Sequence, residues 1–213
     1  MGCSKYSLTD SQTIRKRSRG RWIWRCCASL ALLLEIAVAA SLSFADELSP
    51  TPETAVATGE IPSFYVRAVT GPLAGKSVCY VCRNGERPAV IVLLREIGPD
   101  VTLLLKELDR KVNRHRAEGL RCFAVLLTDT PQRDAARLQT LAFDEKIELP
   151  LTLLGESATQ GSTLAFSREA TVSVVTCQDR RIVERFSFKT GACDENARRS
   201  VIAAAEKLVA GKD

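Results

Sequence analysis

Two apolar segments with an amphipathic segment between them constrain the fold more than any other feature of this chain. Residues 89–94 (AVIVLL) form an unbroken apolar run, and residues 120–128 (LRCFAVLLT) form a second, mostly apolar one. Such runs are typical of strands buried on both faces of a sheet. From about Pro99 to Arg116, apolar residues recur at helical spacing, at positions 101, 104, 105, 108 and 112. Because a crossover helix joins parallel strands, the pattern predicts that the two runs lie side by side and parallel.

The remaining segments complete a predicted α/β fold. The pattern indicates an N-terminal β-hairpin, a second helix starting at Thr130-Pro131, a third buried strand, a second hairpin and a final helix capped by Asp194. The further strands are predicted over residues 64–69, 77–80, 149–154, 171–176 and 182–188, with a turn over 83–88. We therefore expect a three-layer domain, with a central mixed β-sheet flanked by helices on both faces.

The first 45 residues are expected to be a signal peptide. They carry seven Lys or Arg against two acidic residues. A basic stretch (residues 15–25) precedes an apolar run, and Ser43-Phe44-Ala45 supplies the small residues of a cleavage site before Asp46. The alternative is an uncleaved anchor helix, because the apolar run approaches the length of a membrane span, although Glu35 makes permanent residence there costly. The folded part is therefore expected to be exported (periplasmic or secreted), with no stable membrane span after cleavage, and to be membrane-anchored if the signal is retained.

Charge and composition narrow the function of the other 168 residues. They carry 23 basic and 23 acidic residues, so the net charge of +5 belongs to the N-terminal segment. A nucleic-acid binder concentrates basic charge on its folded part, so we expect no nucleic-acid partner. The single His and single Met argue against His-based catalysis and His-rich metal sites. Residues 46–61 are polar and aperiodic and predict a flexible leader, which places the domain at residues 62–213.

The motif that carries chemistry is Cys79-Tyr80-Val81-Cys82. Two residues between cysteines is the spacing of exchangeable disulfides and also of metal knuckles. Arg83 rather than His follows the motif, so haem attachment is not indicated, and no cofactor is expected. Lys76, Arg83 and Arg87 would favour a thiolate, although the sequence predicts no helix after the motif. A static disulfide or packed thiols, thiol–disulfide chemistry and a metal site all remain open.

The order of elements from about residue 64 to residue 208 resembles the thioredoxin superfamily, in particular the redoxin branch of alkyl hydroperoxide reductases and TlpA-like periplasmic thioredoxins. Members of that branch place a reactive cysteine, often in Cys-x-x-Cys, where the first buried strand turns into the first helix. Here residues 95–100 take that place, and Ile97 and Asp100 stand where the sulfurs would be. The family's proline before the fourth strand is missing at residues 169–171, and Pro150 precedes the third strand instead. The resemblance implies a thioredoxin-like fold whose usual Cys-x-x-Cys is replaced.

Two hypotheses follow. The first is an exported thiol–disulfide oxidoreductase that uses the relocated pair on a protein thiol or disulfide partner. By resemblance, Cys79 is then the nucleophile and Cys82 the resolving thiol. The alternative is a non-catalytic thioredoxin-fold binding module whose cysteines are structural or hold a metal. A redox pair needs one sulfur that a partner can reach, so exposure discriminates between them. Cys122 and Cys177 are predicted to lie at the same end of the sheet as the pair, and Cys193 near the other end.

Overall fold

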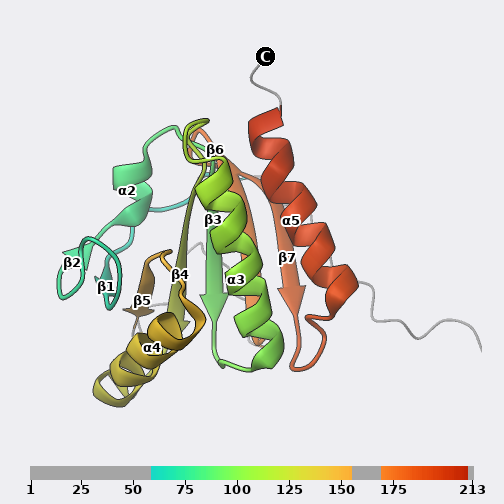
Figure 1. Ribbon diagram of the computed structural model, residues 1–213. Helices are drawn as coiled ribbons and strands as arrows, with labels where there is room; N and C mark the ends of the chain where they lie inside the picture. The colour runs from blue at the N-terminus through green and yellow to red at the C-terminus, as the bar shows by residue number, and fades with distance from the viewer. Residues whose placement is uncertain (1–58, 155–168, 211–213) are drawn as a thin grey trace, which may run out of the picture. The chain divides into compact units, whose positions relative to one another are not determined.

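The computed structural model describes residues 59–154 and 169–210 (Figure 1). The predicted signal peptide and residues 46–58 of the predicted leader lie outside the described residues. The described elements are β1 (Val66–Ala68), β2 (Ser77–Val78), α2 (Tyr80–Asn84), β3 (Ala89–Leu94), α3 (Pro99–Arg114), β4 (Arg121–Leu127), α4 (Pro131–Glu145), β5 (Leu151–Leu154), β6 (Val172–Gln178), β7 (Arg181–Phe188) and α5 (Glu195–Ala210).

The described strands form one mixed sheet in the order β2-β1-β5-β4-β3-β6-β7. The pairs β3–β4 and β4–β5 are parallel, and the other neighbours are antiparallel. Ala89 lies opposite Arg121 and Leu94 opposite Leu126, so the two apolar runs are the parallel neighbours that the sequence predicts. The predicted mixed sheet with an N-terminal hairpin is confirmed.

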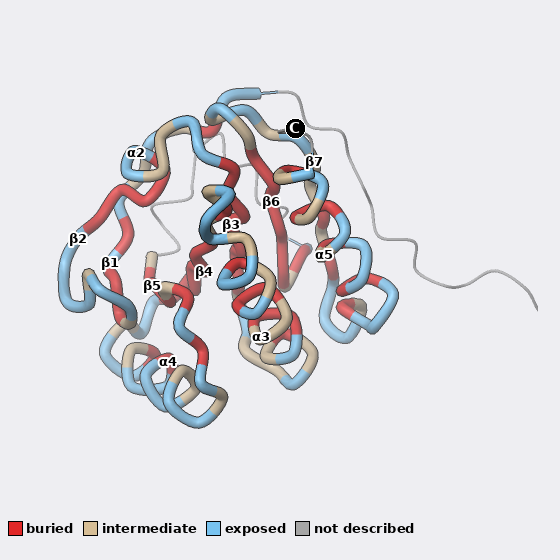
Figure 2. The backbone as a smooth tube through the Cα atoms, turned by 45° about the horizontal axis from the view of Figure 1, so that its top comes forward, coloured by how far each residue is buried: buried red, intermediate tan, exposed pale blue. Residues whose placement is uncertain are grey.

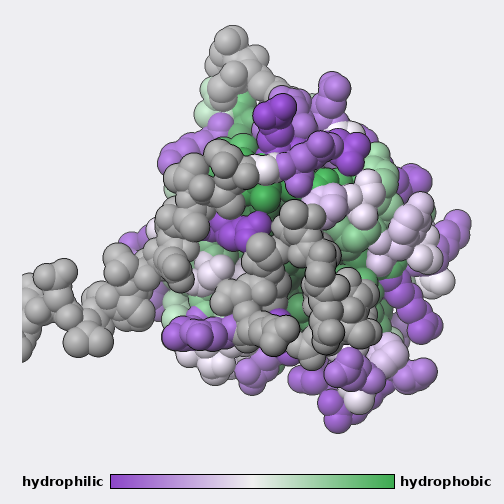
Figure 3. All heavy atoms as spheres, turned by 180° about the vertical axis from the view of Figure 1, so that it is seen from behind, coloured by the Kyte–Doolittle hydropathy of each residue, from purple (hydrophilic) through white to green (hydrophobic). Residues whose placement is uncertain are grey.

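Helices cover the two faces of this sheet unequally. From β3 to β4 and from β4 to β5, the chain moves in the same direction across the sheet, so right-handed crossovers place α3 and α4 on one face. The last helix, α5, packs on the same face (Figure 1). On the other face, the described helical cover is the short α2. Figure 3 views this second side, where apolar side chains lie between polar ones. Over the described residues, no helix combines the length and apolar character that a membrane crossing requires.

Alternation along the central strands builds a core on each side of the sheet. Successive strand residues point to opposite faces. In β3, positions 90, 92 and 94 pack toward α3 and α5, and positions 89, 91 and 93 pack toward the side that carries α2. Figure 2 shows the same central strands buried along their length. The core on the α2 side is therefore the base on which the cysteine motif rests.

The paired backbone of the domain begins earlier than the sequence predicts. Ile61 has no exposed surface, and its N–H donates to the carbonyl of Arg180 at 2.8 Å. The N–H of Ile182 donates to the carbonyl of Gly59 at 3.0 Å, beside a bridge between Glu60 and Arg181. The predicted leader end at residue 61 thus falls inside structure that pairs with β7.

Candidate redox site

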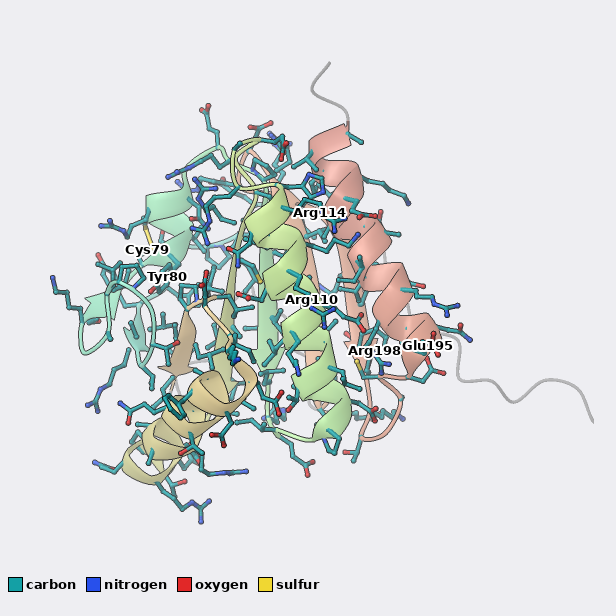
Figure 4. The ribbon with its side chains drawn as sticks, viewed as in Figure 1. Cys79, Tyr80, Arg110, Arg114, Glu195 and Arg198 are labelled. Carbon is teal, nitrogen blue, oxygen red and sulfur yellow. A yellow bond between two sulfur atoms is a disulfide. The ribbon has the colours of Figure 1, made fainter. Side chains whose placement is uncertain are left out.

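Cys79 and Cys82 form a disulfide at the start of α2 (Figure 4). Their Cα atoms are 5.3 Å apart, within the range that a disulfide requires. The chain therefore bends between the two residues. The predicted strand over 77–80 is wrong in its second half, because β2 stops at Val78 and the chain enters a helical turn. The expectation that no helix follows the motif is also wrong, since Cys79 is itself the N-cap residue of α2.

The ends of α2 are closed by specific hydrogen bonds. At its start, the Cys79 sulfur accepts a hydrogen bond from the N–H of Cys82 at 3.2 Å, as a capping side chain does. At its end, Gly85 adopts a positive φ of 59°, and the Arg87 side chain donates to the carbonyls of Asn84 (3.1 Å) and Arg83 (2.8 Å). A helix of five residues is too short to be stable alone. These caps and the packing beneath it therefore hold α2 in place.

The two residues between the cysteines anchor α2 to the sheet. Tyr80 and Val81 are buried, in the same core cluster as Cys79. The Tyr80 ring stacks on Phe123 of β4 with centroids 5.0 Å apart, and Phe64 lies 6.2 Å from Phe123. Burial raises the pKa of Tyr80, against a smaller opposing effect of Arg83, so the phenol is protonated at neutral pH.

The two sulfurs differ in access. Cys79 is 5% exposed, whereas Cys82 is an exposed residue on the outer side of α2. The pair therefore has one cysteine at the surface, as the redox hypothesis requires. The resemblance assigns the attacking role to Cys79, but the exposure favours Cys82 as the sulfur in contact with a partner.

The disulfide and the predicted replaced site lie at opposite ends of β3. The motif precedes the start of β3, whereas residues 95–98 connect its other end to α3 (Figure 1). There Ile97 packs against the core on the α3 side, and Asp100 lies 3.6 Å from the Arg198 guanidinium of α5. The Cys-x-x-Cys of this chain is thus present as a closed pair, at the other end of the strand from the place that the resemblance indicates.

The remaining described cysteines are buried free thiols. Cys122 lies opposite Val90 and Cys177 opposite Ala89, at the end of the sheet that carries α2, as predicted. They face opposite sides, because Cys177 joins the core that contains Cys79 and Cys122 joins the other one. Cys193 precedes α5, near the other end. In the two described ranges, no group of three or more His, Cys, Asp or Glu side chains is placed to hold a metal ion.

These thiols are expected to be unreactive in the folded protein. Burial raises the pKa of Cys177 and of Cys193 to about 11, and it also raises the pKa of Cys122. A raised pKa lowers the thiolate fraction, so at pH 8 a thiol of pKa 11 is about 0.1% thiolate, against roughly 25% for an unperturbed one. Iodoacetamide labelling at pH 8, mapped by mass spectrometry after reduction of the disulfide, should modify Cys82 first. Equal labelling rates for Cys177 and Cys82 would contradict this assignment.

Solved structures provide the comparisons for this fold, since no protein-family model and no curated protein sequence matches the chain. A secreted thiol–disulfide isomerase from Corynebacterium glutamicum has a TM-score of 0.58 at 11% identity, covering 79% of this chain and 98% of that one. The thioredoxin domain of a thiol–disulfide oxidoreductase from Bacteroides vulgatus has a TM-score of 0.55 at 13% identity, covering 73% and 99%. A hypothetical protein from Sinorhizobium meliloti has a TM-score of 0.56 at 16% identity, covering 76% and 90%. The chain therefore has the thioredoxin-like fold.

Proposed function

We propose that this protein is an exported thiol–disulfide oxidoreductase that acts on protein partners through Cys79 and Cys82. The observation that carries the proposal is a closed Cys-x-x-Cys disulfide at the start of a helical turn, with one sulfur exposed and the other buried. Several proteins of similar fold are described as thiol–disulfide oxidoreductases or isomerases, which supports the same chemistry.

The exchange begins at the exposed sulfur. A substrate thiolate attacks the Cys82 sulfur, the new substrate–Cys82 disulfide forms, and the Cys79–Cys82 bond breaks with Cys79 leaving as a thiolate. A second substrate thiolate then attacks the substrate sulfur of the mixed disulfide and releases the Cys82 thiolate. The substrate dithiol loses two electrons and two protons, and the protein pair gains two electrons and takes up protons according to pH. In the reverse direction the Cys82 thiolate attacks a substrate disulfide, and Cys79 resolves the mixed disulfide.

The hydrogen bonding of α2 suits Cys79 to the leaving role. The N–H of Cys82 donates to the Cys79 sulfur, and such a bond strengthens when the acceptor is charged. This N–H therefore stabilises the negative charge that develops on the Cys79 sulfur as it leaves. The attack takes place at the sulfur of the exposed residue, Cys82.

Export is part of the proposal and rests on the first 45 residues. We propose that residues 1–45 direct the chain out of the cytoplasm and that cleavage after Ala45 releases the domain; if the segment is retained, it anchors the protein to the membrane. An oxidising compartment keeps an exchangeable pair supplied with oxidised partners. The Corynebacterium glutamicum protein of similar fold is itself described as secreted.

The reduction potential of the Cys79–Cys82 disulfide tests the proposal against a structural disulfide in a binding module. Structural disulfides of secreted proteins have potentials below about −300 mV, and exchanging pairs lie higher. We expect a value above that limit when the purified protein is equilibrated with thiol–disulfide buffers and the redox state is read by mass spectrometry. A pair that stays oxidised well below −300 mV would identify a structural disulfide instead.

A further inference from the structure

A pocket of about 670 Å³ lies beside the disulfide, between α2, the last turns of α3 and the start of β4. Tyr80, Arg83 and Asn84 form its α2 wall, and neither Cys79 nor Cys82 lines it. Cys82 is exposed on the outer side of the same helical turn. Figure 4 shows Cys79 and Tyr80 together where the chain enters α2. The pocket and the exposed Cys82 therefore share one short helix, in which Arg83 of the pocket wall directly follows Cys82.

Arginine side chains line this pocket together with the carboxylates of Asp109 and Glu148, and Arg116 acts electrostatically on Asp109. Arg83, Arg116 and Arg121 line it, and Arg87 donates to the carbonyls of Arg83 and Asn84 at the end of α2. None of these four forms an ion pair with a carboxylate in the part of the chain that the structure describes. Burial lowers the pKa of Arg121, and the charges of Arg87 and Arg116 lower it further, so three of the cations are close together. A bound anion would reduce the electrostatic repulsion between these neighbouring positive charges.

The acidic groups in the pocket wall already have donors. Asp109 accepts the backbone N–H groups of Glu148 at 3.1 Å and Leu149 at 2.8 Å, which fixes the loop before β5. The Glu148 carboxylate accepts from Asn113 at 3.3 Å. By contrast, Tyr80 is 8% exposed, and its hydroxyl has no hydrogen-bond partner among the described residues. The pocket wall therefore presents guanidinium groups that form no salt bridge among the described residues, whereas the Tyr80 hydroxyl is buried within the wall.

We propose that this pocket binds an acidic side chain of the polypeptide substrate whose cysteine reacts at Cys82; the inference rests on the proposed function. A carboxylate accepts hydrogen bonds from guanidinium groups in a matching planar geometry. Arg83 of the pocket wall follows Cys82 in the same short helix, and an extended chain advances about 3.3 Å per residue. The acidic residue of the substrate is therefore expected within a few residues of the reacting cysteine.

Three cysteine peptides that differ at one position test this inference. They carry Glu, Gln or Lys about three residues before the cysteine, and the measured quantity is the second-order rate of mixed-disulfide formation on the oxidised full-length protein. Rates are corrected for the thiolate fraction of each peptide, because a neighbouring charge shifts the pKa of its thiol. One charge-assisted contact is expected to make the Glu peptide roughly tenfold faster than the Gln peptide, with the Lys peptide slowest. In 1 M salt, where the screening length falls to about 3 Å, the preference should shrink.

Arginine variants locate the preference. Arg121→Gln and, independently, Arg116→Gln should bring the Glu and Gln rates within about twofold, by loss of the charged contact. Arg114→Gln is the matched control, because Figure 4 shows Arg114 at the same end of α3 but beside α5, and it does not line the pocket; it should keep the preference. Equal rates for the three peptides on the unmodified protein would overturn the inference and leave the proposed function standing. The same holds if the Arg114→Gln control loses the preference for the Glu peptide as much as the other two variants do. Exchange with none of the peptides would overturn the proposed function, and the inference with it.

Discussion

Replacing Cys82 with serine is expected to abolish mixed-disulfide formation, whereas replacing Cys79 with serine is expected to preserve it and trap the product. In the Cys79→Ser variant the exposed Cys82 thiol remains, attacks a small disulfide and has no neighbouring thiol to resolve the adduct. In the Cys82→Ser variant the remaining sulfur belongs to Cys79, which is 5% exposed. Incubation of each reduced variant with glutathione disulfide, followed by intact-mass measurement and mapping of the modified peptide, gives the comparison.

Both variants lose turnover, so adduct formation is the informative measurement. Ile97→Ala and Asp100→Ala serve as controls, because these residues lie at the other end of β3 and carry no sulfur. They are expected to leave the exchange rate of the folded protein unchanged. If the Cys82→Ser variant forms the adduct as fast as the Cys79→Ser variant, Cys79 is the sulfur that meets the partner, and the roles implied by the redoxin resemblance apply.

Replacing Phe123 with alanine is expected to lower the free energy of unfolding by about 3–5 kcal/mol. Phe123 is 1% exposed, lies in the core beneath α2 and stacks on Tyr80. Its removal deletes a large apolar side chain and leaves a cavity that the sheet cannot close fully. Urea unfolding followed by circular dichroism measures the loss. Because Tyr80 then loses its support, Cys79 of the reduced protein should also be alkylated faster than in the unmodified protein.

Phe143→Ala provides the matched control for this effect. Phe143 is 83% exposed on α4, so the same change of side chain removes little buried surface. Phe143→Ala is expected to change the free energy of unfolding by less than about 0.5 kcal/mol. Similar urea unfolding midpoints for Phe123→Ala and Phe143→Ala would mean that the Phe123 ring does not support the site.

The sheet could be predicted because its signal is strong and local. Residues 89–94 are apolar at every position, and the residues that follow have helical spacing. A helix after a buried strand predicts a crossover to a parallel neighbouring strand. Strand ends were less predictable: β1 covers Val66–Ala68 rather than the predicted 64–69. Tyr65, at the start of that prediction, is 67% exposed and lies outside the strand.

The cysteine pair was predictable from its spacing, but the shape of the segment that carries it was not. Tyr80 and Val81 have side chains that favour strands, and five residues are too few to display a helical period. The cap that starts α2 comes from a sulfur rather than from the usual Ser, Thr, Asp or Asn. Spacing alone also treats the two cysteines alike, so only the packing of α2 distinguishes the exposed Cys82 from the buried Cys79. The pocket draws its walls from several elements distant in sequence, which no local pattern reveals.

The short separation between Cys79 and Cys82 has a thermodynamic consequence. A crosslink stabilises a protein mainly by restricting the unfolded chain, and the effect grows with the length of the loop that it closes. A loop of four residues restricts the unfolded chain by about 2 kcal/mol in that treatment, against nearly 5 kcal/mol for a loop of about 100 residues. The sequence separation here is three, so closing this disulfide stabilises the fold less than half as much as a crosslink across a loop of about 100 residues would. Reduction of the Cys79–Cys82 bond is therefore expected to lower the free energy of unfolding less than reduction of a long-range disulfide would.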